Sequence, residues 1–207
     1  MNSINKEKFD KAVSYITREG KESLLNWIEK STDFYTAPAS CDHHGNFEGG
    51  LLEHSLNVLE FALTNFNYLL KKKPELEDKK ESVIITALFH DLCKVNQYKK
   101  VEKWVKDSNN QWQKYIGWEV KDTFPYGHGE KSVYLLSKHI QLTQSEALAI
   151  RWHMGSYEVG VTVPGLTKTA YDKVFDTEPL AVIIHAADIM ATVCEKTIDY
   201  KALAIKK

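Results

Sequence analysis

The stretch ALFHDLCKV, residues 87–95, ends an apolar run of the chain and places His90, Asp91 and Lys94 in it. This run predicts a helix over residues 81–94 that is apolar on nearly every face, as expected for the central element of a core. An ionised carboxylate costs several kcal/mol to bury without compensation. Asp91 therefore needs a cation or a strong set of hydrogen bonds close to it.

Two interpretations account for this carboxylate. Lys94 lies three residues after Asp91, so the two side chains could form a buried ion pair, although such a pair gives no role to His90. Alternatively, the carboxylate binds metal ions together with ligand-type side chains from other segments. Four such residues are His54, His128, His153 and Asp188. Two of them lie in apolar stretches, His128 lies between two glycines, and His153 lies at the end of a predicted helix.

Each of these four residues has a structural explanation when it is taken alone. His54 could be a core histidine bonded to a carbonyl group, and Asp188 could hold a neighbouring helix in place. His153 ends a short helix, where the helix dipole favours an imidazolium, and His128 is a loop histidine. Taken together, six ligand-type groups on five segments favour a site for two divalent cations, which would neutralise the buried carboxylates and bind neutral imidazoles.

The rest of the pattern predicts an all-α domain with one inserted β-hairpin. The 207 residues are 43% hydrophobic and 27% charged, which suits a single globular domain. Helices are expected at about 6–30 (two short ones), 51–72, 81–94, 130–140, 143–155 (with a capping box from Thr143 to Glu146) and 178–196. Residues 97–121 alternate charged with apolar residues around the turn DSNN, which is typical of a hairpin. Residues 155–177 are expected to form a loop.

Three segments, GGLLEHSLNV, ALFHDLCKV and HAADIMA, resemble the defining segments of the HD superfamily of metal-dependent phosphohydrolases, in the order H…HD…D. His128 and His153 resemble the added ligands of its two-metal branch, and the segments are most similar to the HD domain of bacterial 3′-to-5′ exoribonucleases. The resemblance implies one HD-type helical bundle over residues 1–207. Its metal-binding core would span about 40–196, after an N-terminal helical extension at 1–35.

The same resemblance implies a role for each ligand. One metal ion would be held by four residues: His54, His90, Asp91 and Asp188. Asp91 would bridge to a second ion held by His128 and His153. The two ions would share a hydroxide that attacks phosphorus, while Lys94 neutralises charge on the transferring phosphoryl group. Asp91 and Lys94 are thus the expected catalytic residues, and the other expected substrate contacts are His43, His44 and Lys131. The metal is left open among Mn²⁺, Fe²⁺, Co²⁺, Ni²⁺, Zn²⁺ and Mg²⁺.

Three functions remain open on these residues. The first is a phosphomonoesterase or phosphodiesterase that acts on a nucleotide, a cyclic nucleotide or a short oligonucleotide. The second is a di-iron oxygenase of the HD fold that oxidises a small polar substrate. The third is a non-catalytic module that binds a nucleotide or a partner, with metals only stabilising the fold. The presence of all six ligands favours the first function over the third.

Charge and cysteine usage bear on partners and compartment. The net charge is −1, so no global basic field attracts nucleic acid, and any such binding has to be local. The Trp and Lys residues of 97–121 are candidates for it, with a homo-oligomer interface as an equal alternative. In a strand pair, however, such alternation more often means that one face packs on the body and the other faces water. The three cysteines are far apart, and neither a leader peptide nor a run of about 18 apolar residues is evident. We therefore expect a cytoplasmic protein without a membrane partner.

Overall fold

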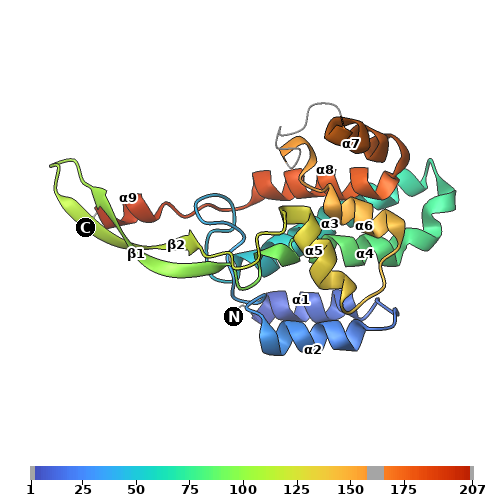
Figure 1. The fold of residues 1–207 in the computed structure, drawn as a ribbon, viewed down its shortest axis with the longest axis horizontal. Helices are drawn as coiled ribbons and strands as arrows, with labels where there is room; N and C mark the ends of the chain where they lie inside the picture. Colours follow the sequence, from blue (N-terminus) through green and yellow to red (C-terminus); the bar gives the residue numbers. More distant parts are fainter. Residues whose placement is uncertain (1–2, 158–165, 206–207) are drawn as a thin grey trace.

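The computed structural model describes residues 3–157 and 166–205, which form a body of packed helices with one projecting hairpin (Figure 1). The helices are α1 (Ser3–Val13), α2 (Lys21–Ser31), α3 (Gly50–Leu70), α4 (Lys80–Phe89), α5 (His128–Ser137), α6 (Gln144–Arg151), α7 (Leu166–Thr177), α8 (Pro179–Cys194) and α9 (Tyr200–Ile205). The strands are β1 (Tyr98–Lys106) and β2 (Trp112–Val120), and 3₁₀ turns lie at Pro74–Lys79, Leu92–Lys94 and Gly155–Tyr157. The predicted all-α domain with an inserted hairpin is confirmed.

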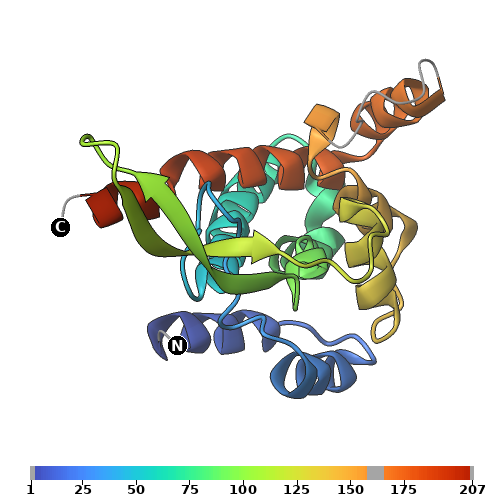
Figure 2. The ribbon, with the colours of Figure 1, turned by 60° about the vertical axis from the view of Figure 1, so that its left-hand side comes forward.

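Three helices, α3, α4 and α8, form the centre of the helical body. α3 packs against both α4 and α8, and α6 contacts α8 and α4 (Figure 2). Residues 82–89 of α4 are all buried, as its unbroken apolar run predicts. The apolar stripe of α3 is buried at Leu52, Leu59 and Phe66. A polar group carried by any of these three helices on its inner side therefore enters the core.

The helix predicted over residues 81–94 ends early, at Phe89. His90 keeps a helical conformation, but Asp91 adopts φ −103° and ψ 22°, in the sparsely populated region between helix and strand. The 3₁₀ turn Leu92–Lys94 follows. With this change of direction, the adjacent side chains of His90 and Asp91 meet, and His90 Nε2 lies 3.4 Å from Asp91 Oδ2.

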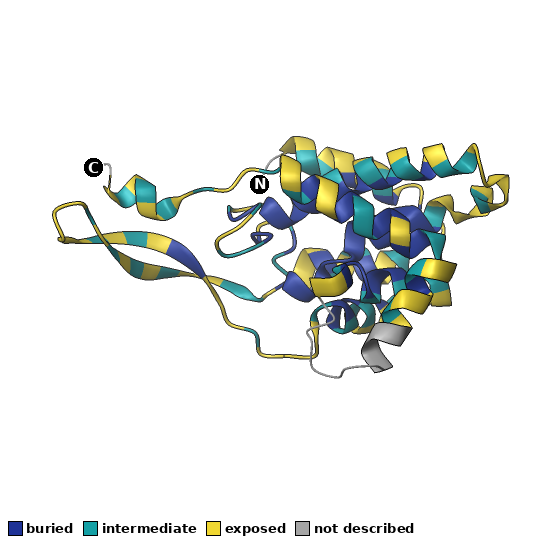
Figure 3. Ribbon diagram, turned by 90° about the horizontal axis from the view of Figure 1, so that it is seen from above, coloured by how far each residue is buried: buried dark blue, intermediate teal, exposed yellow. Residues whose placement is uncertain are grey.

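The hairpin predicted at residues 97–121 is confirmed, and its two strands extend away from the helices (Figures 1 and 3). The strands pair antiparallel, from Tyr98 opposite Val120 to Lys106 opposite Trp112. Asp107 closes the turn, since its Oδ1 accepts hydrogen bonds from the backbone N–H groups of residues 109 and 111. α9 packs against both strands. We call the hairpin, residues 98–120, the arm.

Two C-terminal helices differ from the sequence-based expectation. The loop predicted at 155–177 is wrong for residues 166–177, which form α7, while residues 158–165 lie outside the described part of the chain. The apolar residues of α7 recur at helical spacing, at Leu166, Ala170, Tyr171, Val174 and Phe175, so the signal for this helix is present in the sequence. α9 is a further helix that the pattern does not predict.

No single helix in the described ranges is long and apolar enough to cross a membrane. The pair 170–177 and 179–194 meets the criteria of length and composition only when its two helices are joined, and it is bent by 99°.

A buried ion pair ties the N-terminal helices to the rest of the body. Arg18 lies between α1 and α2, and its Nη1 is 2.9 and 2.7 Å from the two carboxylate oxygens of Glu146 in α6. The Glu146 side chain is fully buried and also accepts from the backbone N–H of Thr143, which completes the predicted capping box. Burial alone would raise the pKa of Glu146, but the hydrogen bonds from Arg18, Ser82 and the Thr143 backbone, together with the Arg18 charge, outweigh burial and lower it.

We predict that Arg18→Ala lowers the free energy of unfolding at pH 7 by about 3 kcal/mol, because it leaves the Glu146 carboxylate buried without its cation. The folded-state pKa of Glu146 lies below its unfolded value. The contribution of the pair is therefore present above the unfolded pKa and is lost as the pH falls through the folded one. Urea denaturation of wild type and variant should show the difference shrinking below about pH 4.

The matched control is Lys6→Ala, which removes the surface pair between Lys6 and Asp10. This variant should change the free energy of unfolding by less than about 1 kcal/mol. An effect of Arg18→Ala no larger than that of the control would contradict the assigned role of the Arg18–Glu146 pair.

Candidate metal centre

All six predicted metal ligands meet at one place inside the helical body. They come from five segments: His54 from α3, His90 and Asp91 from the end of α4, His128 from the first residue of α5, His153 from just after α6, and Asp188 from α8. Five of the six are at most 8% exposed, and His128 is half-buried. The structure therefore brings together residues that lie up to 134 positions apart in the sequence.

One oxygen of the Asp91 carboxylate faces Lys94 and two histidines. Asp91 Oδ2 lies 2.6 Å from Lys94 Nζ, so the predicted buried Asp–Lys pair is present. The same oxygen lies 3.4 Å from His90 Nε2 and 3.5 Å from His54 Nε2. His54 Nε2 is also 3.2 Å from Asp188 Oδ1, which joins the second carboxylate to the group. The ion pair and the histidine cluster therefore share one carboxylate and are not alternatives.

The other carboxylate oxygen, Asp91 Oδ1, faces the two remaining histidines. It lies 2.8 Å from His128 Nε2 and 3.4 Å from His153 Nε2. The second ring nitrogen of His128, Nδ1, lies 3.3 Å from the sulfur of Cys93, a buried residue that the sequence analysis did not select. Each oxygen of Asp91 thus faces a different pair of imidazoles, which is the arrangement expected of a carboxylate that bridges two sites.

Backbone carbonyl groups orient two of these imidazoles. His90 Nδ1 lies 2.9 Å from the carbonyl oxygen of Ala87, and His153 Nδ1 lies 2.7 Å from that of Ile150. Because a carbonyl oxygen can only accept, both Nδ1 atoms carry the proton. In the neutral ring the Nε2 atom then presents its lone pair to the Asp91 carboxylate. Metal-binding histidines are commonly held by such a hydrogen bond on the opposite ring nitrogen.

A third histidine is held by a carboxylate that the sequence analysis missed. The two oxygens of Glu195 lie 3.0 and 3.1 Å from His54 Nδ1, and Asn57 Nδ2 donates to one of them at 2.9 Å. The Glu195 side chain is only 3% exposed. It follows directly after α8, four positions beyond Ala191, and a single glutamate beside Lys196 carries no functional signal in the sequence. Only the packing of α8 on α3 shows that it reaches His54.

Burial and neighbouring charges move the pKa values of these groups in opposite directions. Burial alone would raise the pKa of the Asp91 carboxyl, but the Lys94 ammonium and the surrounding imidazoles hold it well below its usual range. Burial alone would lower the pKa of His54, but hydrogen bonds to two carboxylates raise it to about 9. For His90, burial dominates and lowers the pKa. An ionised carboxylate therefore faces at least one neutral imidazole, and both groups bind metal ions in these charge states.

These residues fit divalent metal ions. His153 Nε2 is buried and makes no hydrogen bond within the described residues, although a carboxylate oxygen lies 3.4 Å away. His90 Nε2 and His54 Nε2 face each other at 3.3 Å. Among the described residues, four groups have ligand atoms within 4.8 Å of one another: His54, His90 and Asp188; His90, Asp91 and His153; Asp91, Cys93 and His128; and His44, His54 and Glu195. The Nε2 lone pairs of His90 and His153 face Asp91 oxygens with no proton between them, and a cation placed there would stabilise both groups. Imidazole with carboxylate is a common ligand set for divalent ions.

A cavity of about 370 Å³ opens beside the cluster. Its polar lining comprises His44, Asp91, Lys94, His153, His185 and Asp188, and the rest of its lining comprises Met154, Tyr157, Ile189, Thr192 and Val193. Tyr157 and Val193 are 83% and 80% exposed, so they lie at its mouth. The volume is within the range of pockets that bind small molecules.

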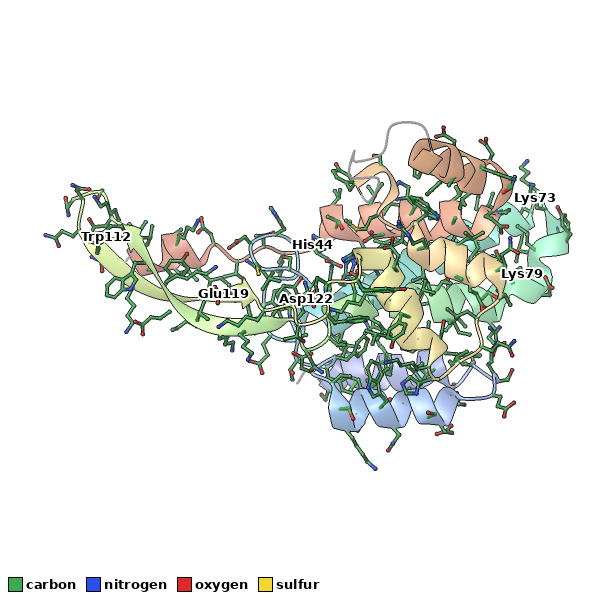
Figure 4. All side chains as sticks on the ribbon, viewed as in Figure 1. His44, Lys73, Lys79, Trp112, Glu119 and Asp122 are labelled. Atoms are coloured by element: carbon green, nitrogen blue, oxygen red, sulfur yellow. The ribbon has the colours of Figure 1, made fainter. Side chains whose placement is uncertain are left out.

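The four predicted substrate contacts are placed differently. Lys94 and His44 line the cavity, and the His44 ring lies 5.0 Å from that of His54; Figure 4 labels His44 where the helical body meets the arm. His43 is exposed and is not among the lining residues. The Lys131 ammonium lies 2.6 Å from Asp122 Oδ1 and is also absent from the lining. The structure thus brings Lys94 and His44 to the cavity, and not His43 or Lys131.

Comparisons with known proteins bear on this cluster. The family model described as HD domain matches residues 51–192, more than two thirds of the chain. A curated relative, the dihydroneopterin 2′,3′-cyclic phosphate phosphodiesterase of Methanocaldococcus jannaschii, is 29% identical over 99 residues, which are 48% of this chain. The match spans 39% of that relative's length. No solved structure matches the chain significantly.

The range matched by the family model begins three residues before His54 and ends four residues after Asp188, so it contains all six clustered ligands. The ligand order along the chain and the buried cluster of histidine and aspartate agree with this match. The chain belongs to the HD-domain family.

Proposed function

We propose that this protein is a metal-dependent phosphohydrolase that cleaves a small phosphodiester, such as a nucleotide or cyclic nucleotide. The observation that carries the proposal is the meeting of four imidazoles, Asp91 and Asp188 in one buried cluster, beside a cavity of small-molecule size. The relative named as a cyclic phosphate phosphodiesterase supports a phosphodiester substrate. The further resemblance to exoribonucleases stays a prediction.

The ligands divide into two sets around Asp91. On the side of Asp91 Oδ2, a first ion would be held by His54, His90 and Asp188. On the side of Asp91 Oδ1, a second ion would be held by His128 and His153. Divalent ions held there would supply Lewis acidity that polarises a phosphoryl oxygen and acidifies water. The hydrogen bonds from the Nδ1 atoms of His90 and His153 to backbone carbonyl groups fix the orientation of these two imidazoles before any ligand binds.

Lys94 is the residue best placed to contact the phosphoryl group. It is the one lysine among the described residues that line the cavity, and its side chain is 10% exposed. Its ammonium now lies against Asp91 Oδ2, and a phosphoryl oxygen of a substrate would offer it a second anionic partner. A fixed cation in a site from which water is largely excluded stabilises charge that develops in the transition state.

The outer part of the cavity suits the non-phosphate part of the substrate. Met154, Ile189 and Val193 contribute apolar surface beside the ligand cluster, and Tyr157 adds an aromatic ring at the mouth. Such a lining favours a flat heterocycle over a sugar phosphate, because planar rings stack on aromatic and aliphatic side chains. Nucleobases and the pterin of the relative's substrate share this chemistry.

We predict that the purified protein, never exposed to a chelator, contains two divalent transition-metal ions per chain by elemental analysis and hydrolyses a 2′,3′-cyclic nucleotide. Asp91→Asn should lower the metal content and reduce turnover by at least about 10³-fold, because it removes the carboxylate shared by both ligand sets. Asp78→Asn, at a carboxylate whose side chain is 72% exposed, is the control and should change neither quantity.

Fewer than one metal ion per chain would contradict the two-metal site. Metal without hydrolysis of any phosphoester would contradict the proposed activity. Two iron ions with uptake of O₂ and no hydrolysis would favour the oxygenase alternative.

We predict that Lys94→Ala weakens competitive inhibition by inorganic phosphate by about tenfold or more and lowers kcat/KM by about 10²-fold, because the phosphoryl group loses its fixed cation. Lys94→Arg should restore part of the phosphate affinity. Lys79→Ala, at an exposed lysine, is the control. If Lys94→Ala destabilises the fold but leaves phosphate inhibition unchanged, Lys94 serves only to neutralise Asp91.

We predict that Glu195→Gln weakens metal affinity by about 10- to 100-fold, the usual effect of losing the carboxylate behind a metal-binding histidine. Titration of the metal-depleted protein with Zn²⁺ or Mn²⁺ by calorimetry measures this effect. Glu60→Gln, at an exposed position of the same helix as His54, is the matched control. Equal affinities for Glu195→Gln and wild type would show that Glu195 does not orient His54.

A further inference from the structure

The arm has an exposed face that the metal centre does not use. Side chains alternate between the two faces of a strand, so the even-numbered residues of both strands share one face. On this face Trp104, Trp112 and Ile116 are 56%, 61% and 52% exposed. Trp118 of the same face is buried and donates to the carbonyl oxygen of Asn46, and Val105 and Tyr115 of the opposite face are half-buried. α9 packs against both strands. The even-numbered face therefore carries two indole rings that are open to solvent, Trp104 and Trp112.

Tryptophan and lysine alternate across the exposed face. Trp104 pairs with Lys114 across the strands, and Lys106 pairs with Trp112, so the two indoles are diagonal neighbours. Lys106 Nζ lies 5.2 Å from the Trp112 ring and Lys114 Nζ lies 5.9 Å from the Trp104 ring. Figure 4 places Trp112 at the far end of the arm, away from the helical body. Two flat rings and two cations thus alternate along a ribbon that reaches into solvent.

Charge is segregated between the arm and the helical body. The arm, residues 98–120, carries five lysines and three acidic residues, so it has a net charge of +2 in a chain of net charge −1. Two arm lysines have carboxylate partners, Lys100 with Glu48 and Lys114 with Glu102, but both pairs are about half exposed. Exposed ion pairs contribute little stability, so phosphate groups can compete for these lysines. The arm therefore presents a positive surface although the chain as a whole does not.

The chain runs directly from the arm to the metal centre past a second group of exposed aromatic rings. β2 ends at Val120, and His128 begins α5. Between them Phe124 and Tyr126 stack with ring centroids 5.2 Å apart, and both contact Tyr134 of α5. All three rings are at least 36% exposed. Exposed aromatic side chains therefore lie along the segment that joins the end of β2 to His128, one of the candidate metal ligands.

We propose that the even-numbered face of the arm binds single-stranded nucleic acid. Bases stack on Trp104 and Trp112 while Lys106 and Lys114 contact the phosphates, the combination that sequence-tolerant single-strand binding requires. A second copy of the chain is the less favoured occupant, because two arms placed face to face would bring together segments of net charge +2. The proposal concerns binding alone and does not depend on hydrolysis.

The test is fluorescence anisotropy of a labelled oligo(dT) strand of about 15 nucleotides, long enough for one such site. We expect wild type to bind at low salt. Trp104→Ala combined with Trp112→Ala should lower the affinity by at least about tenfold, and the matching double change to Phe should retain most of it. Lys106→Ala combined with Lys114→Ala should reduce the slope of log affinity against log salt by about 1.4.

Tyr68→Ala is the control, because Tyr68 is an exposed aromatic residue (64%) on α3 and not on the arm. Circular dichroism and thermal melting establish that each variant is folded. The proposal is overturned if wild type does not bind the strand, or if the Trp and Tyr68 variants bind equally. It is also overturned if light scattering shows a dimer that the double Trp variant dissociates, since a second copy would then occupy the face.

Discussion

The Asp91 carboxylate is 2% exposed at the centre of a helical body, and such a charge is tolerated only where cations or hydrogen-bond donors meet it on both oxygens. Lys94 supplies one cation from the next turn of the chain. The remaining neighbours are imidazoles, two of which are held by backbone carbonyls with their Nε2 lone pairs facing the carboxylate. A lone pair and a carboxylate that face each other repel, and a divalent ion between them would attract both. The polar core is therefore best understood as a place for cations.

Several devices elsewhere in the fold keep the five ligand segments in place around this carboxylate. Gly129 is required next to His128, because a Cβ there would lie 2.2 Å from the carbonyl oxygen of Arg151. This close approach brings the start of α5 against the end of α6, and so His128 near His153. The capping box at Thr143 and the ion pair between Arg18 and Glu146 secure the other end of α6. Helix packing and caps thus set the positions of side chains that the chemistry needs.

The molecule separates two kinds of surface. The metal centre is internal, and its cavity is lined by ligands on one side and apolar residues on the other. The arm is external and basic, and α9 packs against both of its strands. A two-stranded hairpin is marginally stable by itself, so the packing of α9 against it is needed for it to extend from the body. The exposed indole rings of Trp104 and Trp112 have no such structural role in the described part of the chain.

The sequence by itself determined the fold class, the hairpin, the capping box at Thr143 and the six ligand-type residues, because each rests on a local pattern. An apolar helix that carries His90 and Asp91 is anomalous without any knowledge of its neighbours. Tertiary structure alone decided the roles of Glu195 and Cys93, since their partners lie on other segments and their own positions carry no periodic signal. It also separated Lys94, which lines the cavity, from Lys131, which pairs with Asp122. These four residues lie at or near helix ends, where the direction of the chain sets which partner a side chain reaches. That direction depends on packing between residues far apart in the sequence.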